Sequence, residues 1–459
     1  MQQLLDIFGA GGDSIINGLN IINDSGLGSG LATTTLGSAD AGNLTIDETA
    51  KLTIENNSSS DRSVVGLATA SLRLRRSTGD GGKLFVDADE IEISGNEPGQ
   101  FSRIPNDELA NEIRKITTGI TSATQANGNA GEIKIHTRKL TIQNGAAITA
   151  GVPFTDEDAG NGGTLNINAN ELIKLIGKAS LASGSRGGGL AGELILNTGK
   201  LILEKGAVIA SDTSSSGDAG DLNITTNQLS ISDGSRIGAA TAGKGNGANI
   251  NIKESSLVEL AGSTSVIDDN GTEVPIPSGI FANSQGSGKA GNIDVETEKL
   301  IVRDGAVLST QVSNISEEVG GNLAVSGNIL EVTGGGQLRT TTEGKGDAGN
   351  ITLDVADQIT LEGNESGLFA NTDLGSEGKG GNILTGKPTE QNDGSTLITP
   401  QTVKTVAIRN GAKIGVDSEG KGEGGEVEIQ AGSLTLDNNA AISAETTSNT
   451  GGDIDLKIQ

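Results

Sequence analysis

Residues Ala290–Thr310 read AGNIDVETEKLIVRDGAVLST and hold the pattern that decides the fold. Apolar and polar residues alternate in three runs, separated by the turn residues Ala290–Asn292, by a short charged bend and by Asp304-Gly305. An apolar period of two, broken by turn residues, predicts short β-strands. A fixed sequence period is the signature of a repeat architecture, so copies of this stretch determine the expected fold. Close copies occupy residues 130–150, 191–211 and 219–239.

The repeat unit is too small to fold alone. It measures about 28 residues, and units of this size bury their apolar faces only by stacking on one another. The chain has 71 glycines, six Phe and neither Tyr nor Trp among its 459 residues, which favours a thin aliphatic core in similar layers. We therefore expect an all-β fold, a right-handed single-stranded parallel β-helix of about thirteen coils with three short strands in each.

The repeats also predict how the chain is divided. Residues 1–40 are expected to form a degenerate start or cap, and residues 41–459 the β-helix repeat domain. Four longer gaps between strand starts predict insertions, which in solenoids emerge at the corners of coils. These insertions lie at 56–77, 97–127, 263–289 and 385–404.

A longer period is superposed on the coil. The fourth, seventh and tenth units carry one extra residue between their first two strands, so we expect a true repeat of three coils. Asn follows Gly at many coil starts, as at Asn292 and Asn322, where stacked Asn side chains are expected to form a ladder along the axis.

The insertions differ in character. The sequence NDELANEIRKI at 106–116 is the one helix candidate, because Leu109, Ile113 and Ile116 share a helical face. The sequence VIDDNGTEVPI at 266–276 predicts a hairpin closed by Asp-Asn-Gly. Residues 387–402 are expected to form a polar loop that contains proline.

Charge and composition narrow the function classes. The formal net charge of −27 argues against a nucleic-acid partner and against an anionic membrane surface. The absence of cysteine excludes disulfides, thiolate metal sites and a Cys nucleophile. No apolar run approaches the roughly 20 residues of a membrane helix. The N-terminal sequence lacks the basic and apolar regions of a signal peptide.

Few residues are candidates for catalysis. His136 is the only histidine, and its alternation with Ile133 and Ile135 predicts that it faces solvent. Paired acidic residues can cut glycosidic bonds or hold calcium, but here they fall at predicted corners, where solvated charge is expected. We therefore expect no catalytic, cofactor-binding or metal-binding residues and no cofactor. The acidic groups occur at Asp156–Asp158, Asp268-Asp269 and Glu317-Glu318.

Candidate contact residues lie in two insertions. Arg73, Arg75 and Arg76 alternate along one segment and could bind an anionic glycan, although the same pattern describes the outer face of an irregular strand. Asp268, Asp269 and Asn270 lie at the turn of the predicted hairpin.

The repeats resemble those of filamentous-haemagglutinin-type exoproteins of two-partner secretion systems. The resemblance spans residues 41–459 and rests on the template, its copies, and the segments SGIFANSQGSGKAGN at 278–292 and SGLFANTDLGSEGKGGN at 366–382. It implies Sec-dependent export, passage through an outer-membrane β-barrel transporter, and a secreted or surface-attached adhesin. It carries over no catalytic residue.

The chain departs from that family in two ways. It has neither a signal peptide nor the family's Asn-Pro-Asn-Gly motif, and its last unit, GGDIDLKIQ at 451–459, stops within a coil. We therefore expect a piece of a longer protein or the product of a broken gene.

The resulting functional expectation is a non-enzymatic, extracellular or outer-membrane-associated adhesin region that contacts glycans or proteins on host or neighbouring cells. Two alternatives stay open: a polysaccharide-active β-helix enzyme, lyase or hydrolase, and the stalk of a contact-dependent toxin-delivery protein.

Overall fold

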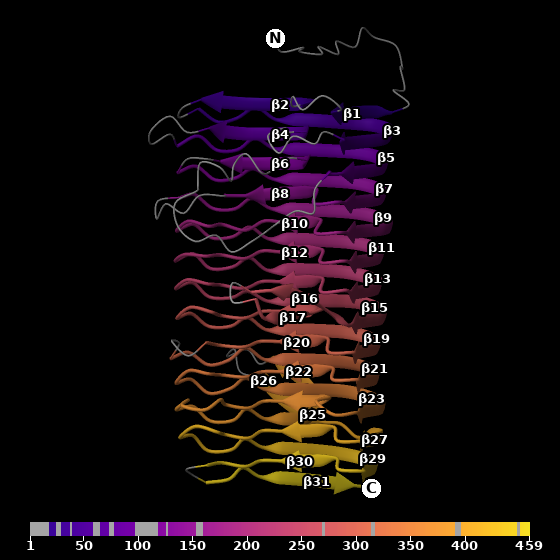
Figure 1. The fold of residues 1–459 in the computed structure, drawn as a ribbon, viewed down its shortest axis with the longest axis vertical. Coiled ribbons are helices and arrows are strands. Elements are labelled where there is room, and N and C mark those ends of the chain that lie inside the picture. Colours follow the sequence, from indigo (N-terminus) through magenta and orange to yellow (C-terminus); the bar gives the residue numbers. More distant parts are fainter. Residues whose placement is uncertain are drawn as a thin grey trace.

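A computed structural model of the chain shows a rod of stacked coils (Figure 1). Within the described residues the rod contains strands and no helix, and none of those residues belongs to a helix long and apolar enough to cross a membrane. The described residues are 18–23, 29–36, 39–57, 65–72, 78–96, 118–124, 127–152, 159–268, 271–313, 317–390, 396–447 and 450–459.

Each complete coil contributes one long strand to a parallel sheet, here called the long-strand sheet. Equivalent strands of successive coils pair in register, as Leu194 with Leu222 and Leu222 with Ile250. The members are β1 Leu19–Asn23, β3 Leu44–Asn56, β5 Leu84–Ser94, β7 Ile133–Gln143, β9 Leu165–Ile176, β11 Leu194–Glu204, β13 Leu222–Ser232, β15 Ile250–Ala261, β19 Ile293–Arg303, β21 Leu323–Thr333, β23 Ile351–Glu362, β25 Ile383–Glu390, β27 Val403–Arg409, β29 Val427–Asp437 and β31 Ile454–Ile458.

A second parallel sheet of 13 strands, the short-strand sheet, forms another face of the rod. Its strands also pair in chain order, so the predicted β-helix of about thirteen coils is confirmed. The members are β2 Ser29–Leu36, β4 Val65–Leu72, β6 Thr118–Thr124, β8 Ala147–Gly151, β10 Ser180–Ala182, β12 Val208–Ala210, β14 Arg236–Gly238, β18 Gly279–Phe281, β20 Val307–Ser309, β22 Gln337–Arg339, β24 Gly367–Phe369, β28 Lys413–Gly415 and β30 Ala441–Ser443.

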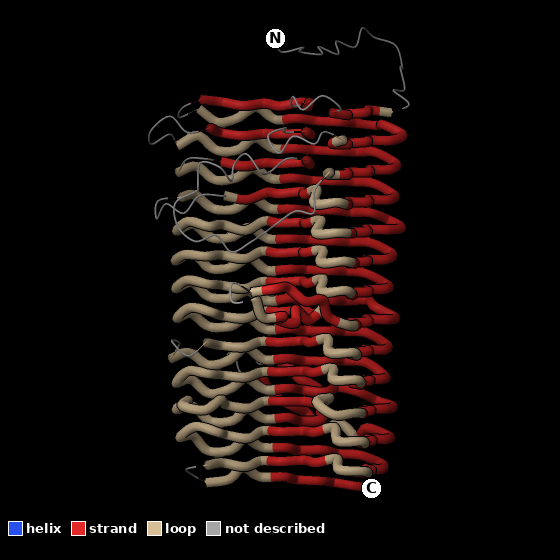
Figure 2. Tube along the Cα trace, in the orientation of Figure 1, coloured by secondary structure: helices blue, strands red, loops and turns tan. Residues whose placement is uncertain are grey.

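The strands of a coil differ from the predicted three short segments. The first two predicted strands of the template merge into the single strand β19, because pairing with the next coil continues through the charged bend. At this bend Thr297 is buried, and its hydroxyl donates a hydrogen bond to the carbonyl of Lys299 at 3.1 Å. The third face is reduced to single-residue bridges, such as Ser284 with Val312. Figure 2 shows these faces as strands joined by loops that repeat from coil to coil.

Alternation along the long strands places the core. In β11 the side chains of Leu194 and Leu196 are fully buried, whereas the intervening Ile195 is only partly buried. Each buried side chain stacks on its equivalents above and below, so aliphatic residues fill identical layers without large aromatic rings. The core is thin because each coil adds only a few inward side chains.

The geometry of the corners explains why the turn residues of the template recur from coil to coil. A Cβ placed on Gly291 would lie 1.9 Å from the carbonyl oxygen of Ala248 in the preceding coil, so only glycine allows the coils to approach this closely. At the second corner Asp304 and Gly305 both have positive φ values, 56° and 79°. Two left-handed residues in succession favour an Asn-Gly or Asp-Gly pair.

The three-coil period is present in the structure. β9, β15 and β23 each contain 12 residues where the intervening complete long strands from β5 to β21 contain 11, and the pairing register shifts at the extra residue. The predicted additional residue therefore forms a β-bulge at every third coil.

The described residues between 18 and 36 already belong to the rod. Leu19 of β1 pairs with Leu52, and Ser29 of β2 pairs with Val65. Likewise β4, β6 and β18 are ordinary rungs that lie inside segments predicted as insertions 56–77, 97–127 and 263–289. The helix predicted at 106–116 lies outside the described residues.

Among the described residues, two antiparallel hairpins interrupt the parallel architecture. The predicted hairpin is confirmed as β16 Ser263–Ile267 paired with β17 Glu273–Pro277. The expectation of a polar loop at 387–402 is wrong, since β25 pairs antiparallel with β26 Thr396–Pro400 through its second half. β25 and β27 both pair with β23, so this second hairpin splits one long strand at its bend.

Candidate functional site

The predicted contact residues are only partly within the described residues. Arg73, Arg75, Arg76, Asp269 and Asn270 lie outside them. Asp268 lies at the end of the hairpin β16–β17. Its backbone N–H donates to the Thr272 carbonyl at 2.9 Å, and its Oδ1 accepts from the Thr272 N–H at 2.7 Å. Asp268 therefore helps to close the turn.

The acidic pair Glu317-Glu318 belongs to a row of charged residues in the loops of successive coils. Glu317 contacts Lys345 of the next coil at 2.5 Å, and Glu318 lies 3.6 Å from Lys289 of the preceding coil. Farther along, Lys421 lies 2.9 Å from Glu377. Opposite charges thus face each other between coils. All of these side chains are about half-exposed or more, in agreement with the prediction of solvated charge at the corners. Residues 156–158 lie outside the described residues.

His136 points outward from β7, as its alternation predicts. Its side chain is half-exposed, and its Nδ1 lies 3.3 Å from Oδ2 of Asp87, which occupies the equivalent position in β5. Alternation predicts the direction of a side chain, but this contact depends on the register between two coils. The two residues are 49 positions apart in sequence because the insertion at 97–127 separates their coils.

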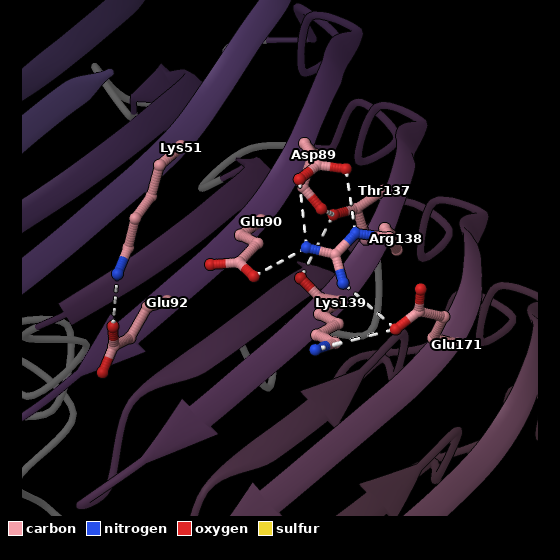
Figure 3. A network of polar contacts seen from close by, with 8 residues as sticks. All are labelled: Lys51, Asp89, Glu90, Glu92, Thr137, Arg138, Lys139 and Glu171. Atoms are coloured by element: carbon pink, nitrogen blue, oxygen red, sulfur yellow. Dashed lines mark hydrogen bonds and ion pairs between the residues drawn. The ribbon is translucent and has the colours of Figure 1, made fainter. Parts of the chain in front are cut away.

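A charge cluster centred on Arg138 lies at the bend of the long-strand sheet (Figure 3). His136 and Arg138 line the same surface hollow. Arg138 of β7 binds Asp89 of the preceding coil through two hydrogen bonds, Nε to Oδ1 at 3.0 Å and Nη2 to Oδ2 at 3.1 Å. Its Nη2 also donates to Glu90 at 2.7 Å, and its Nη1 donates to Glu171 of the following coil at 3.0 Å. One guanidinium therefore joins three coils.

The bulge of the three-coil period supplies part of this cluster. Glu171 lies beside the extra position of β9, between the paired residues Ala169 and Leu172. It contacts both Arg138 and Lys139, the latter at 3.6 Å. Thr137 stabilises the bend from inside by donating to the Asp89 carbonyl at 3.0 Å.

The electrostatics of the cluster follow from these contacts. Hydrogen bonds to Asp89, Glu171 and Glu90 raise the pKa of Arg138 above its ordinary value. The Arg138 hydrogen bonds in turn lower the pKa of Asp89 below that of an ordinary carboxyl group. The guanidinium is thus committed to carboxylates of this chain, and its geometry is that of a clamp between coils.

A shallow open hollow adjoins the cluster. Its lining includes Asp87, His136, Arg138, Asn170 and Glu171. These groups offer carboxylates, an imidazole and an amide to a polar ligand on the rod surface. Within the described part of the chain, no group of three or more His, Cys, Asp or Glu residues has an arrangement that could hold a metal ion.

Side-chain ladders run along the corners between these sites. The Oδ1 of Asn292 accepts a hydrogen bond from the backbone N–H of Asn322 at 2.8 Å, and Asn322 repeats this with Asn350 at 2.9 Å. The predicted ladder is present, but each amide oxygen bonds a backbone N–H of the next coil. Asp221 makes the same contact with Asn249 at 2.9 Å, which shows that only the acceptor oxygen is required.

The two hairpins are the largest described departures from the repeat. Figure 1 places β16 and β17 at the middle of the rod, where three apolar side chains of this hairpin are exposed. Sequence reasoning identified the hairpin from its Asp-Asn-Gly turn. It missed the Arg138 cluster, whose signal was the recurrence of charged residues at the equivalent positions 89–90, 138–139 and 171.

Comparisons with protein-family models, with curated proteins and with solved structures found no match to this chain.

Proposed function

We propose that this chain is the rod and contact surface of a non-enzymatic adhesive protein that acts at a cell surface. The observation that carries the proposal is the combination of a uniform, extended solenoid with hairpins inserted at single positions of individual coils. A stack of thirteen coils at about 4.8 Å per coil is roughly 60 Å long. A rod of this kind displays a large surface while its core stays the same.

The repeat sequences support the surface location. The segments at 278–292 and 366–382 resemble repeats of filamentous-haemagglutinin-type exoproteins, whose partners are an outer-membrane transporter during export and cell-surface glycans or proteins afterwards. A signal peptide and an Asn-Pro-Asn-Gly secretion domain encoded in frame upstream would support export of this chain. Upstream coding sequence without either would contradict it.

The adhesive function can be tested directly. Beads coated with the purified chain are expected to attach to cells or to a glycan-bearing surface, and soluble chain should compete with them. Beads coated with an unrelated acidic protein of similar size provide the control. If folded chain gives no more attachment than that control over a panel of cell types and glycans, the adhesive role is wrong.

One observation favours a second candidate, a polysaccharide-active enzyme. In the hollow beside Arg138, the Nδ1 of His136 lies 3.3 Å from the Oδ2 of Asp87, and such a pair can transfer a proton. Cleavage of an acidic or neutral polysaccharide by the chain, lost in Asp87→Asn with the fold retained, would support the enzyme and contradict the adhesin.

A further inference from the structure

The hairpin β16–β17 replaces one residue of an ordinary corner. Ala261 pairs with Ser232, and Gly279 pairs with Arg236, so Gly262 and Ser278 take the places of Asp233 and Ser235. Residues 263–277 thus stand where the preceding coil has Gly234 alone. The two ends of the hairpin meet, because the Ser278 N–H donates to the Gly262 carbonyl at 3.0 Å.

The two edges of this hairpin differ in their backbone donors. The Asp268 N–H bonds to Thr272, which makes 268/272 a hydrogen-bonded pair. Such pairs alternate along an antiparallel ladder, so positions 263, 265, 267, 273, 275 and 277 direct their backbone groups outward. On β17 the outward positions 275 and 277 are prolines, which have no N–H to donate. The outer edge of β17 is therefore blocked.

The outer edge of β16 is open. Its outward positions are Ser263, Ser265 and Ile267, each with a backbone N–H and a carbonyl and none with a charge. Among the described residues, β16 pairs with β17 alone. Native proteins commonly protect exposed edges with proline, charge or a covering segment, as β17 is protected here. An edge left open beside a blocked one is suited to pairing with another chain.

Apolar side chains accompany the open edge. Ile267 is 67% exposed, and the cross-strand pair Val266 and Val274 is 47% and 40% exposed. The root of the hairpin packs against the rod at Gly234. A Cβ added to Gly234 would lie only 2.2 Å from the Cγ2 of Thr264. The exposed apolar residues thus lie near the turn of a hairpin whose root contacts the rod.

Charge identifies the kind of partner. Residues 263–277 contain three acidic residues and neither Lys nor Arg, so the hairpin itself is negative, whereas Glu259 before its root is already paired with Arg303 of the following coil. A second copy of this chain, with its net charge of −27, would be repelled. A segment with basic residues would be attracted to the same surface.

We propose that the outer edge of β16 binds an extended, basic segment of a partner protein as a third strand of the hairpin sheet. Backbone hydrogen bonds to 263, 265 and 267 would give the affinity, as in other cases of strand addition. Apolar side chains of the added strand would cover the exposed valines and isoleucine, and its basic side chains would face the acidic surroundings. This inference rests on the proposed contact function and names the partner class for one site.

The first test uses a fluorescent peptide of seven residues that alternates Lys and Val, with binding to the full chain followed by anisotropy. Ser265→Pro removes one outward N–H from the edge and is expected to weaken binding at least tenfold. Ser265→Ala is the matched control, because it removes the same hydroxyl and its hydrogen bond to Glu273 but keeps the N–H. It should bind like the wild type. Equal affinity for the Pro and Ala variants would overturn the proposal.

A second variant keeps the proposal testable if Ser265→Pro disturbs the hairpin. Replacing residues 263–277 by a single Gly restores the ordinary corner, and this rod should melt like the wild type but lose the peptide. A peptide that alternates Glu and Val should not bind the wild type. Retained Lys-Val binding by the hairpin-free rod, or equal Glu-Val binding, would refute strand addition. Self-association lost in Ser265→Pro would show a second copy to be the occupant instead.

The adhesion experiment tests the proposed function and the peptide experiment tests the strand-addition site, so either hypothesis can be refuted while the other stands. Beads that attach to cells through the hairpin-free rod as well as through the wild type would leave the adhesive function standing and remove this site from it.

Discussion

At the scale of single residues, the rod depends on inward aliphatic side chains and on ladder residues at its corners. A buried side chain such as Leu196 lies between equivalents in both neighbouring coils, so a change at one residue is felt by three layers. The corner residues act through single acceptor oxygens instead. The two classes of residue are therefore expected to differ in the cost of substitution.

Leu196→Ala should lower the free energy of unfolding by about 2–5 kcal/mol, the usual range for a buried leucine truncated to alanine. Leu196→Asp should be worse, because it places an unpaired carboxylate in the core. Ile195→Asp, on the outer side of the same strand, is the control. The measurement is denaturant unfolding followed by circular dichroism. Equal stability of the two Asp variants would mean that the inward register of β11 is wrong.

Asn322→Ala should cost roughly 0.5–1.5 kcal/mol, since it removes the acceptor for the backbone N–H of Asn350. Asn322→Asp keeps that oxygen, as Asp221 does in its own coil, and should stay close to wild type. Thermal unfolding of the pair checks this. If both variants lost the same stability, the amide nitrogen and not the acceptor oxygen would be the important group.

At the scale of strands and hairpins, the bends of the long strands are held by contacts between coils. The bend of β7 carries Arg138, which joins carboxylates of the coils on both sides. These groups are partly exposed, so salt and water weaken each contact. The two-bond geometry with Asp89 distinguishes this cluster from an isolated surface pair.

The stability conferred by Arg138 should depend on pH. The pKa of Asp89 is lowered in the folded chain by its hydrogen bonds to Arg138, so the contribution is present above the ordinary carboxyl pKa. It is lost as the pH falls through the lower folded value. Arg138→Gln should therefore destabilise the rod at neutral pH, and its difference from wild type should shrink on acidification. Denaturant unfolding at several pH values measures this difference. A difference that stayed constant down to strongly acidic pH would exclude an ionic role.

The sequence predicted these elements to different extents. Alternation located the long strands and their inward residues, and the Asp-Asn-Gly turn located β16–β17. The hairpin β25–β26 was missed, since Pro388 and Pro400 made its polar sequence resemble a loop. The Arg138 cluster was missed because residues 48 and 49 positions apart meet only once the coil register is known.

At the scale of the whole molecule, each coil contacts its neighbours in the stack and repeats their geometry. Leu194 and Leu222 are equivalent residues of adjacent coils, 28 positions apart. Stability in such arrays is close to a sum of coil and interface contributions. The rod should accordingly tolerate a change in the number of coils far better than a change in their register.

Deletion of residues 194–221 removes one coil and should leave a folded rod that is shorter by about 5 Å. Deletion of residues 194–207 removes half a coil and should prevent folding of the stack, because it sets unlike faces against each other. Circular dichroism and small-angle X-ray scattering distinguish the two. A half-coil deletion that folded as well as the full-coil deletion would contradict the register.

The bulges of β9, β15 and β23 also bear on which recombination events in the gene would encode a rod that still folds. Since β9, β15 and β23 each carry one extra residue at the bend, three coils apart, recombination between misaligned copies can add or remove a complete three-coil block. The product still places each bulge three coils from the next. Such exchanges lengthen or shorten the rod. Each hairpin is gained or lost together with the three-coil block that contains it. The length of the rod and the set of hairpins it displays can therefore change together in one event.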